Sequence, residues 1–376
     1  MKLTLVQSKS EISAFHQVLD RVYANDSQFI YPLRADVEEV FDPVKNPVPH
    51  KEGRCQRWVL LDAQDQPVGR VAAFYRDKKD AEGLSVRRGG LGFFECINDE
   101  RLATELFDTA EQWLSEQKVC SIDAPINFGD RDSFWGLLIS AKTYPSYRES
   151  YNPPYYQAWF EKRGYAVEIE QTTYEITQAT FNFDRFSAIA SRAMSNPDYR
   201  FEYFKYSELE AYAGYFAEVY NLGWAHHEDF KPIQAADVYK RLKSIKPAMP
   251  EKLAIFAFAG DRPIGFFVAI LEVNQIFKDF KGTMNAWNGL RFLWKKGNID
   301  KAKGIVFGII PEYQNKGIET GLIMRCYEAV QHMPKLKSME LAWIGDFNPK
   351  MLSMLQSLGA ELTKVHHTYR KEIPSK

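Results

Sequence analysis

The sequence predicts a mixed α/β chain made of two tandem copies of one domain, each a mixed sheet covered by helices. Three observations support this expectation. The 376 residues exceed the usual size of a single hydrophobic core. Strand-like and helix-like segments alternate with short connections. Turn and cap residues recur at a nearly constant spacing along the chain.

The internal repeat is carried by prolines, glycines and asparagines. Pro67-Val68-Gly69 and Pro263-Ile264-Gly265 each lie in a predicted hairpin, and 265 − 69 is 196. Asn152-Pro153 and Asn348-Pro349 each open a predicted helix, and 348 − 152 is again 196. The glycines expected to cap the ends of those two helices are Gly164 and Gly359. We therefore expect two copies with the same order of elements.

Each copy begins with a strand and a helix, within residues 3–23 and 201–220. A hairpin, a central strand, a long helix, another strand, a short helix and a last strand pair follow. In the first copy the central strand covers residues 90–97, and Asn98 is the expected helix cap. The long helices are supported by apolar residues on one face. These are Leu102, Leu106, Ala110 and Trp113 in the first copy, and Ile318, Leu322, Cys326 and Val330 in the second.

The junction between the copies is expected near residues 178–200, where Asn196-Pro197-Asp198 fits a turn. This predicts a first domain at residues 1–180 and a second at 196–376.

The composition indicates a globular protein, and we expect no binding to nucleic acid. The net charge is −1 and 45% of the residues are apolar. No apolar run of about 18 residues is present, and the start lacks a signal-peptide core, so we expect a cytoplasmic protein without stable membrane insertion. The cysteines lack metal-ligand spacing and are expected to be small buried hydrophobes. They are Cys55, Cys96, Cys120 and Cys326.

The most informative stretch covers residues 304–319, where an apolar strand meets a proline and then a polar, glycine-containing turn that opens a helix. Backbone N–H groups and the positive end of the helix dipole make such a turn an anion cradle. The alternative is an ordinary strand-to-helix loop. Gly308, inside the strand, indicates a bulge or a close backbone approach, or else a glycine tolerated for packing.

This turn resembles the signature of the Gcn5-related N-acetyltransferase (GNAT) superfamily, Gln/Arg-x-x-Gly-x-Gly/Ala. Gln314 and Gly317 match it, while Glu319 replaces the last small residue. With the repeat, the chain resembles bacterial tandem GNAT proteins that carry Asn-Pro-Pro-Tyr-Tyr (residues 152–156) and Glu-x-x-Trp-Ile (residues 340–344).

The resemblance implies two tandem acyl-CoA N-acyltransferase-like domains. It also implies an N-acyltransferase that uses acetyl-CoA or another acyl-CoA, with acetyl transfer as the first expectation, and acts on a small-molecule or peptide amine. The pyrophosphate would lie on the turn and the pantetheine arm between the strands at residues 304–310 and 338–344. The residues expected to bind coenzyme A are Ile309, Ile310, Gln314, Asn315, Lys316, Gly317, Ile318, Glu319 and Asn348.

The corresponding turn of the first copy, residues 96–101, has no glycine and carries Asp99 and Glu100. These carboxylates would repel a pyrophosphate. We therefore expect the first copy to be a degenerate, structural or substrate-shaping partner, rather than a second active site.

Candidates for acid–base chemistry are few. The family often places a tyrosine acid where this chain has Phe160 and Leu355. Glu340 is a candidate general base, or else a solvated charge at a strand edge. Tyr369 is a candidate acid, or else an ordinary half-buried strand tyrosine. Asn348 also has a structural role as a helix cap.

The cluster at residues 224–229 holds His226 and His227 with two carboxylates. Because no further ligands follow at zinc-like spacing, we expect a surface or substrate-cleft cluster rather than a metal site. In the cleft, either histidine could bind the substrate or take its proton.

An insertion at residues 274–303 carries apolar residues every three or four positions. They are Phe277, Phe280, Met284, Trp287, Leu290 and Trp294. A core-facing helix is the first expectation. A lid over an acyl chain, or a patch for a partner or a membrane, is the alternative, because lysines follow directly. Those lysines are Lys295, Lys296, Lys301 and Lys303.

Two other functions fit the sequence. One is transfer from aminoacyl-tRNA, as in tandem relatives that build peptidoglycan bridges. The other is a ligand-binding or interaction module whose catalytic groups have decayed, for which Glu319 and the missing helix tyrosine argue.

Overall fold

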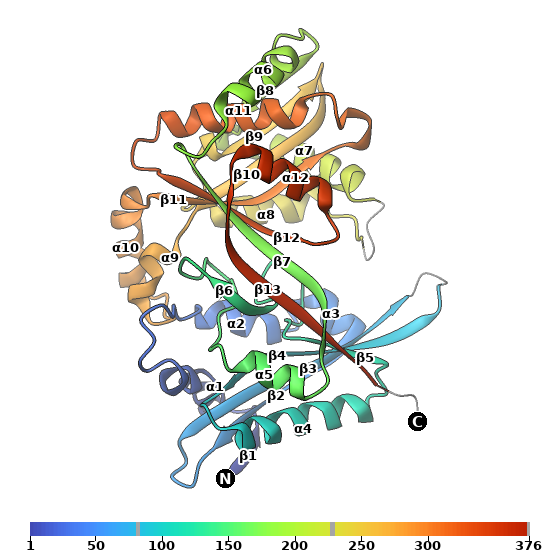
Figure 1. The fold of residues 1–376 in the computed structure, drawn as a ribbon, viewed down its shortest axis with the longest axis vertical. Coiled ribbons are helices and arrows are strands. Elements are labelled where there is room, and N and C mark those ends of the chain that lie inside the picture. Colours follow the sequence, from blue (N-terminus) through green and yellow to red (C-terminus); the bar gives the residue numbers. More distant parts are fainter. Residues whose placement is uncertain (80–82, 226–229, 374–376) are drawn as a thin grey trace.

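The computed structural model describes residues 1–79, 83–225 and 230–373, and its strands form one continuous mixed sheet (Figure 1). The order across the sheet is β1-β2-β3-β4-β5-β13-β7-β12-β11-β10-β9-β8, and β6 pairs with β13. The two ends of the sheet mirror each other, β1 to β5 on one side and β8 to β12 on the other. The predicted mixed α/β architecture with two similar halves is therefore confirmed.

The strands have these bounds. The first half contains β1 (Lys2–Leu5), β2 (Gly53–Leu61), β3 (Pro67–Lys79), β4 (Ser85–Cys96), β5 (Ser121–Ala124) and β6 (Leu137–Ala141). The second contains β8 (Tyr199–Tyr203), β9 (Ala254–Ala259), β10 (Arg262–Leu271), β11 (Lys301–Ile309) and β12 (Ser338–Gly345). The long central strands are β7 (Ala166–Thr177) and β13 (Glu361–Glu372).

The two central strands are exchanged between the halves. β13, at the end of the second sequence copy, pairs with β5 of the first half. β7, at the end of the first copy, pairs with β12 of the second half. The two also pair with each other, antiparallel, across the middle of the molecule (Figure 1). The division at residues 180 and 196 stays a prediction for the sequence copies, but each half of the sheet is completed by the other copy.

The helices cover the two halves of the sheet. In the first half they are α1 (Lys9–Val22), α2 (Arg34–Phe41), α3 (Pro47–Glu52), α4 (Glu100–Glu116) and α5 (Tyr156–Lys162). α6 (Phe183–Met194) connects the copies. The second half has α7 (Leu209–Gly223), α8 (Ala235–Ile245), α9 (Asn274–Phe277), α10 (Ala286–Lys295), α11 (Ile318–Gln331) and α12 (Pro349–Leu358).

Side-chain caps set several of the helix ends. Ser8 and Glu11 form a capping box at α1. The cap of α4 is Asp99, one residue later than the predicted Asn98. Asn348 caps α12, and Gly359 ends it with a φ of 82°, as the sequence predicts.

Two large apolar clusters fill the halves. The second-half cluster includes Ile255, Phe256, Phe266, Ile318 and Leu322, all essentially buried. The first-half cluster includes Leu60, Val71, Leu106, Phe160 and Tyr369. Tyr369 comes from β13, so the last strand of the chain completes the first core.

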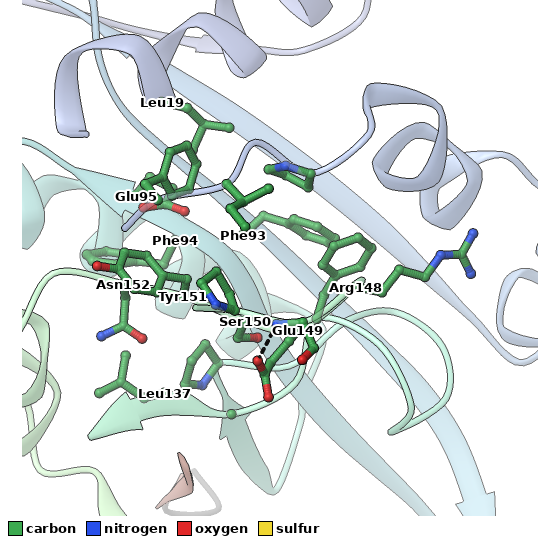
Figure 2. A pocket seen from close by; sticks show the side chains of 18 of the residues that line it. Leu19, Phe93, Phe94, Glu95, Leu137, Arg148, Glu149, Ser150, Tyr151 and Asn152 are labelled. Carbon is green, nitrogen blue, oxygen red and sulfur yellow. Dashed lines mark hydrogen bonds between the residues drawn. The ribbon is translucent and has the colours of Figure 1, made fainter. Parts of the chain in front are cut away.

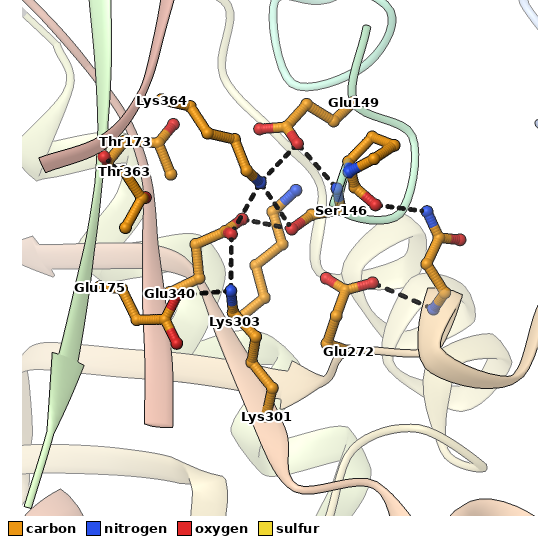
Figure 3. Close-up of polar contacts among 12 residues, drawn as sticks. Ser146, Glu149, Thr173, Glu175, Glu272, Lys301, Lys303, Glu340, Thr363 and Lys364 are labelled. Atoms are coloured by element: carbon orange, nitrogen blue, oxygen red, sulfur yellow. Dashed lines mark hydrogen bonds and ion pairs between the residues drawn. The ribbon is translucent and has the colours of Figure 1, made fainter. Parts of the chain in front are cut away.

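A buried ionic network joins the exchanged strand β13 to strands of the second half (Figure 3). Glu340 on β12 has no exposed surface, and its Oε2 lies 2.8 Å from Nζ of Lys364 on β13. Lys364 Nζ also lies 2.6 Å from Glu149 Oε2, while Lys301 Nζ on β11 lies 3.3 Å from Glu340 Oε2. Ser146 donates a further hydrogen bond to Glu340. The network thus joins β11, β12 and β13 to a loop of the first half.

The electrostatics of Glu340 follow from this arrangement. Burial alone would raise the pKa of its carboxyl group, but the ammonium groups of Lys364, Lys303 and Lys301 lower that pKa to about 2. Glu340 is therefore ionised in the folded protein at all ordinary pH values, and it stabilises the buried Lys364 and the half-buried Lys301 and Lys303.

We predict that Glu340→Gln lowers the free energy of unfolding by about 3–5 kcal/mol, because it leaves Lys364 buried without its strand partner. The lowered pKa gives the sign of the pH dependence. The stabilisation is complete above the ordinary carboxyl pKa of 4.5 and is lost as the pH falls toward about 2. Urea unfolding of wild type and variant across this acidic range measures both effects.

The matched control for this prediction is the double replacement Glu340→Met with Lys364→Met, which removes both charges and fills the space with apolar atoms. Its stability is expected to lie closer to wild type than that of the single variant. An exposed ion pair contributes at most about 1 kcal/mol to stability. A smaller loss of unfolding free energy in Glu340→Gln would therefore contradict the proposed contribution of this network.

Candidate functional site: two clefts of unequal content

The strand–turn–helix segment predicted in the second half is present. β11 ends at Ile309, a short 3₁₀ turn covers Pro311–Tyr313, and α11 begins at Ile318. Gly317 has a φ of 83° and Asn315 a φ of 62°, both in the left-handed region. The Gln314 amide donates to the Ile309 carbonyl at 3.2 Å and closes the turn.

A carboxylate occupies part of this turn. Glu319 Oε1 accepts a hydrogen bond from the Asn315 backbone N–H at 3.0 Å. A Cβ added to Gly317 would lie 3.2 Å from Cβ of Ala193, because α6 packs against the turn. An anion bound here would have to displace the Glu319 carboxylate from one of the backbone amides.

The strands beside this turn separate as expected. β11 and β12 pair from Lys301 with Ser338 to Gly304 with Leu341, and their pairing ends there. Gly308 lies beyond this point, and a Cβ on it would come within 2.4 Å of the Trp224 ring. Of the two interpretations of Gly308, the close approach is confirmed, and the approaching group is an aromatic side chain.

The two predicted acid–base candidates, Glu340 and Tyr369, do not lie beside the second-half turn. Glu340 is in the buried ionic network and is not a solvated edge charge. Its full burial and lowered pKa suit a strand anchor and make it a poor general base. Tyr369 lies in the first-half core beside Ala124, with its OH donating to Glu161 at 3.2 Å, because β13 is exchanged. Burial raises the pKa of Tyr369 to about 12. Neither side chain lines the second-half turn.

Asn348 accepts a hydrogen bond from the Met351 N–H at 3.2 Å, so its structural role as a cap is present. His226 and His227 lie outside the described residues. Within the described residues, no group of histidine, cysteine, aspartate and glutamate side chains could hold a metal ion.

A cavity lies in the first half, over the central strand β4 (Figure 2). Its volume is about 90 Å³, room for a small head group but not for a long chain. β4 pairs with β5 over Arg88–Gly90, and Ile126 N–H then donates to the Leu91 carbonyl. Beyond this point a bulge interrupts the pairing of β4 with β3, and Phe93 has a φ of 47°.

The bulge is followed by a buried polar cluster. Glu95 is 7% exposed and Arg70 2% exposed, and both line the cavity. The hydroxyl of Tyr23 donates to Glu95 Oε2 at 2.7 Å, and the hydroxyl of Tyr156 lies 3.1 Å from the same oxygen. The Arg70 guanidinium lies 3.5 Å from Glu95 Oε1. Tyr156 also accepts a hydrogen bond from the Cys96 N–H at 2.7 Å.

The protonation of this cluster is set by its burial. Desolvation raises the pKa of Glu95, and the nearby Arg70 charge offsets only part of that effect. Desolvation also raises the pKa values of Tyr23 and Tyr156 well above their ordinary value, so both phenols stay protonated. A carboxylate with a raised pKa is suited to take a proton from an amine near neutral pH.

The second half replaces this cluster with aromatic rings. Arg70 pairs with Glu95 across β3 and β4, and Phe266 pairs with Gly308 across β10 and β11. Since 266 − 70 is 196, these are equivalent positions of the repeat. The Phe266 ring is stacked on the Trp224 ring, with centroids 6.2 Å apart. The polar pair of the first half is therefore an apolar stack in the second.

Sequence reasoning missed Arg70, Glu95, Tyr23 and Tyr156. The available signal was the presence of an arginine and a glutamate inside two otherwise uncharged stretches, residues 67–75 and 89–96, at positions where the repeat has phenylalanine and glycine. Tyr156 belongs to the Asn-Pro-Pro-Tyr-Tyr motif that supported the family resemblance. The first-half turn also has its own carboxylate, because Asp99 accepts from the Arg101 N–H at 3.0 Å.

Comparison with known proteins supports this fold. No family model matches the chain. It is 24% identical to Protein YghO of Escherichia coli (strain K12), over 97% of this chain and 94% of that protein. It is 21% identical to a bacterial ceramide synthase of Caulobacter vibrioides (strain NA1000 / CB15N), over 98% of this chain and 96% of that protein.

Two solved structures superpose over nearly the whole chain. A tandem GNAT protein from the clavulanic acid biosynthesis pathway gives a TM-score of 0.57 at 10% identity, covering 100% of both chains. The GCN5-related glucosamine N-acetyltransferase region of a fungal multi-domain GH3 β-N-acetylglucosaminidase gives 0.56 at 13% identity, covering 98% of this chain and 38% of that chain. The chain therefore has the tandem GNAT fold, and the resemblance drawn from the turn and the repeat is confirmed at the level of the fold.

We predict that Tyr156→Phe lowers the free energy of unfolding by about 1–3 kcal/mol, because the buried Cys96 N–H loses its acceptor. Thermal or urea unfolding measures the change. Tyr144→Phe is the control, since Tyr144 is 55% exposed and its substitution is expected to have little effect. Equal stability of the two variants would show that the cluster around Glu95 does not depend on this hydroxyl.

Proposed function

We propose that the protein is an acyl-CoA-dependent N-acyltransferase whose acceptor amine binds in the first-half cavity, against Glu95. One observation carries the proposal: a buried carboxylate with a raised pKa lines a cavity beside the bulged central strand of a GNAT fold. The second half has an aromatic stack at the equivalent position.

The proposed chemistry follows from the position of Glu95. The amine nitrogen attacks the thioester carbonyl carbon, so a C–N bond forms and the C–S bond breaks, releasing coenzyme A. Glu95 takes the proton that the amine nitrogen loses. Its raised pKa improves the match to an amine near neutral pH, and Tyr23 and Tyr156 hold the carboxylate in place.

One feature favours an amine with a long apolar chain, and the cavity limits which part of such an amine it can enclose. One relative over nearly its whole length is named a ceramide synthase, and a ceramide is the N-acyl derivative of a long-chain amino alcohol. The cavity is lined mainly by aromatic and aliphatic side chains, and its volume of about 90 Å³ suits the amino head group alone. The apolar chain would then extend out of the cavity.

The position of coenzyme A is a separate part of the proposal. The sequence-based proposal places its pyrophosphate on the second-half turn at residues 309–319. The left-handed Gly317 supports that site, and the Glu319 carboxylate opposes it. Acyl transfer at Glu95 requires the thioester to lie in the first half, which favours instead the first-half turn at residues 96–101, where Asp99 is the opposing carboxylate.

We expect Glu95→Gln to lower kcat by roughly 100-fold or more, the usual contribution of a positioned base. Free-thiol release from acetyl-CoA and a long-chain acyl-CoA, over a panel of amines that includes a long-chain amino alcohol, measures it. Because burial raises the pKa of Glu95, the acidic limb of the kcat/KM profile should lie at a higher pH than for an exposed glutamate, and the limb should disappear in the variant. Glu218→Gln, on the exposed side of α7, is the matched control. Full activity of Glu95→Gln would contradict the proposal that Glu95 is the general base.

Calorimetry with coenzyme A tests whether the turn at residues 309–319 binds the pyrophosphate. If the second-half turn holds the pyrophosphate, Glu319→Gln is expected to tighten binding roughly five- to ten-fold, since removing a like charge at such a site is worth about 1 kcal/mol. Gly317→Glu should abolish binding, and its thermal unfolding shows whether the variant folds. Unchanged affinity in both variants would contradict the second-half site and favour the first-half turn.

A further inference from the structure

The inserted helix α10 presents an apolar face to solvent. Trp287 is 68% exposed, Leu290 61% and Trp294 83%. These residues are spaced by three and four positions, so they lie on one side of the helix. Leu293 and Met284 extend the same patch at 52% and 41% exposed. The expectation of a core-facing helix is wrong for this face, because only Asn288 and Phe292 of α10 are buried.

The helix is firmly attached by its other side. Phe292 packs edge-on against Phe277, with ring centroids 5.4 Å apart. Asn288 donates to the Thr283 carbonyl at 2.8 Å, and Asn285 caps the helix. The apolar face is therefore held outward by the fold, on the outer side of the molecule next to β11 (Figure 1).

The patch is surrounded by positive charge. Residues 278–298 contain five basic residues and one acidic residue, although the whole chain has a net charge of −1. The acidic residue, Asp279, is paired with Lys295 at 3.5 Å. The exposed Lys278 and Lys281 stand beside it. A groove next to Leu293 and Trp294 is lined by three lysines, two of which lie outside this segment. These are Lys246, Lys296 and Lys335.

We propose that α10 is a docking helix for the surface of an anionic lipid bilayer. Exposed tryptophans near both ends of a short helix favour the interface between head groups and acyl chains, and flanking lysines favour anionic head groups. The helix would lie in the plane of the surface. None of the helices in the described part of the chain could span a bilayer.

Docking through α10 would also bring the first-half cavity to the bilayer. Asn274, at the start of the same insertion, lines the cavity and donates to the Pro145 carbonyl at 3.0 Å. Farther along, the Gly282 carbonyl accepts from the Arg34 N–H at 2.8 Å. The insertion therefore connects the proposed docking face to both loops that border the cavity. The docking proposal itself does not depend on the proposed acyl transfer.

Flotation with vesicles tests the proposal, using vesicles of phosphatidylcholine alone and of phosphatidylcholine mixed with phosphatidylglycerol. Wild type is expected to float with the mixed vesicles and to bind the neutral ones much more weakly. The double variant Trp287→Ser, Trp294→Ser should lose at least ten-fold in partitioning. Lys278→Gln with Lys281→Gln should lose roughly five-fold per lysine and show a weaker dependence on salt.

Phe347→Ser is the matched control, because Phe347 is 59% exposed but lies between β12 and α12. It is expected to bind vesicles as wild type does. Failure of the wild type to bind either kind of vesicle, or equal binding by the tryptophan variant, would overturn the proposal. A wild-type dimer that becomes a monomer in the tryptophan variant, without vesicle binding, would assign the face to a second copy of this chain instead.

Discussion

The exchange of β7 and β13 is the constraint on which the rest of the structure depends. Two antiparallel strands, each from one sequence copy, complete the sheet of the other copy. Charge adds to the backbone pairing, because Lys364 on β13 and Glu340 on β12 form a buried ion pair that spans β7. A register shift that separated the two charges would leave each of them buried without a partner. The pair therefore disfavours shifted registers of β13.

The exchange leaves the two halves free to differ around their clefts. Across the β3–β4 pair the first half holds an arginine and a glutamate, whereas the second half holds a phenylalanine and a glycine covered by a tryptophan. The arginine and glutamate are buried, so the carboxylate needs hydrogen bonds from the neighbouring tyrosine hydroxyls. The aromatic stack needs the glycine because a Cβ at that position would clash with the tryptophan ring. One fold thus supports a polar cavity in one half and a filled, apolar position in the other. This asymmetry is the physical reason to place chemistry in the first half.

Much of the fold could be predicted from the sequence because turns and caps depend on local residues. The 196-residue repeat, the left-handed Gly317 and Gly359, and the cap at Asn348 all follow from such local preferences. Strand exchange is not local, and it moved Tyr369 into the first core and Glu340 into a buried network. The cluster at Glu95 was missed because its members come from α1, β3, β4 and α5, which only the fold brings together. For α10 the sequence left a core-facing helix and an exposed patch as alternatives, because apolar spacing identifies a helix face but not what covers it.

β13 follows every other described helix and strand along the chain, and this order has a consequence for biosynthesis. The first core contains Tyr369, so it lacks a strand until β13 has been synthesised, even though its other elements are made first. Until then β5 has an open edge, which is a site for wrong pairing between nascent chains. The two copies therefore cannot mature one after the other as independent domains, and a gene split at the junction would yield two incomplete products that need each other to fold.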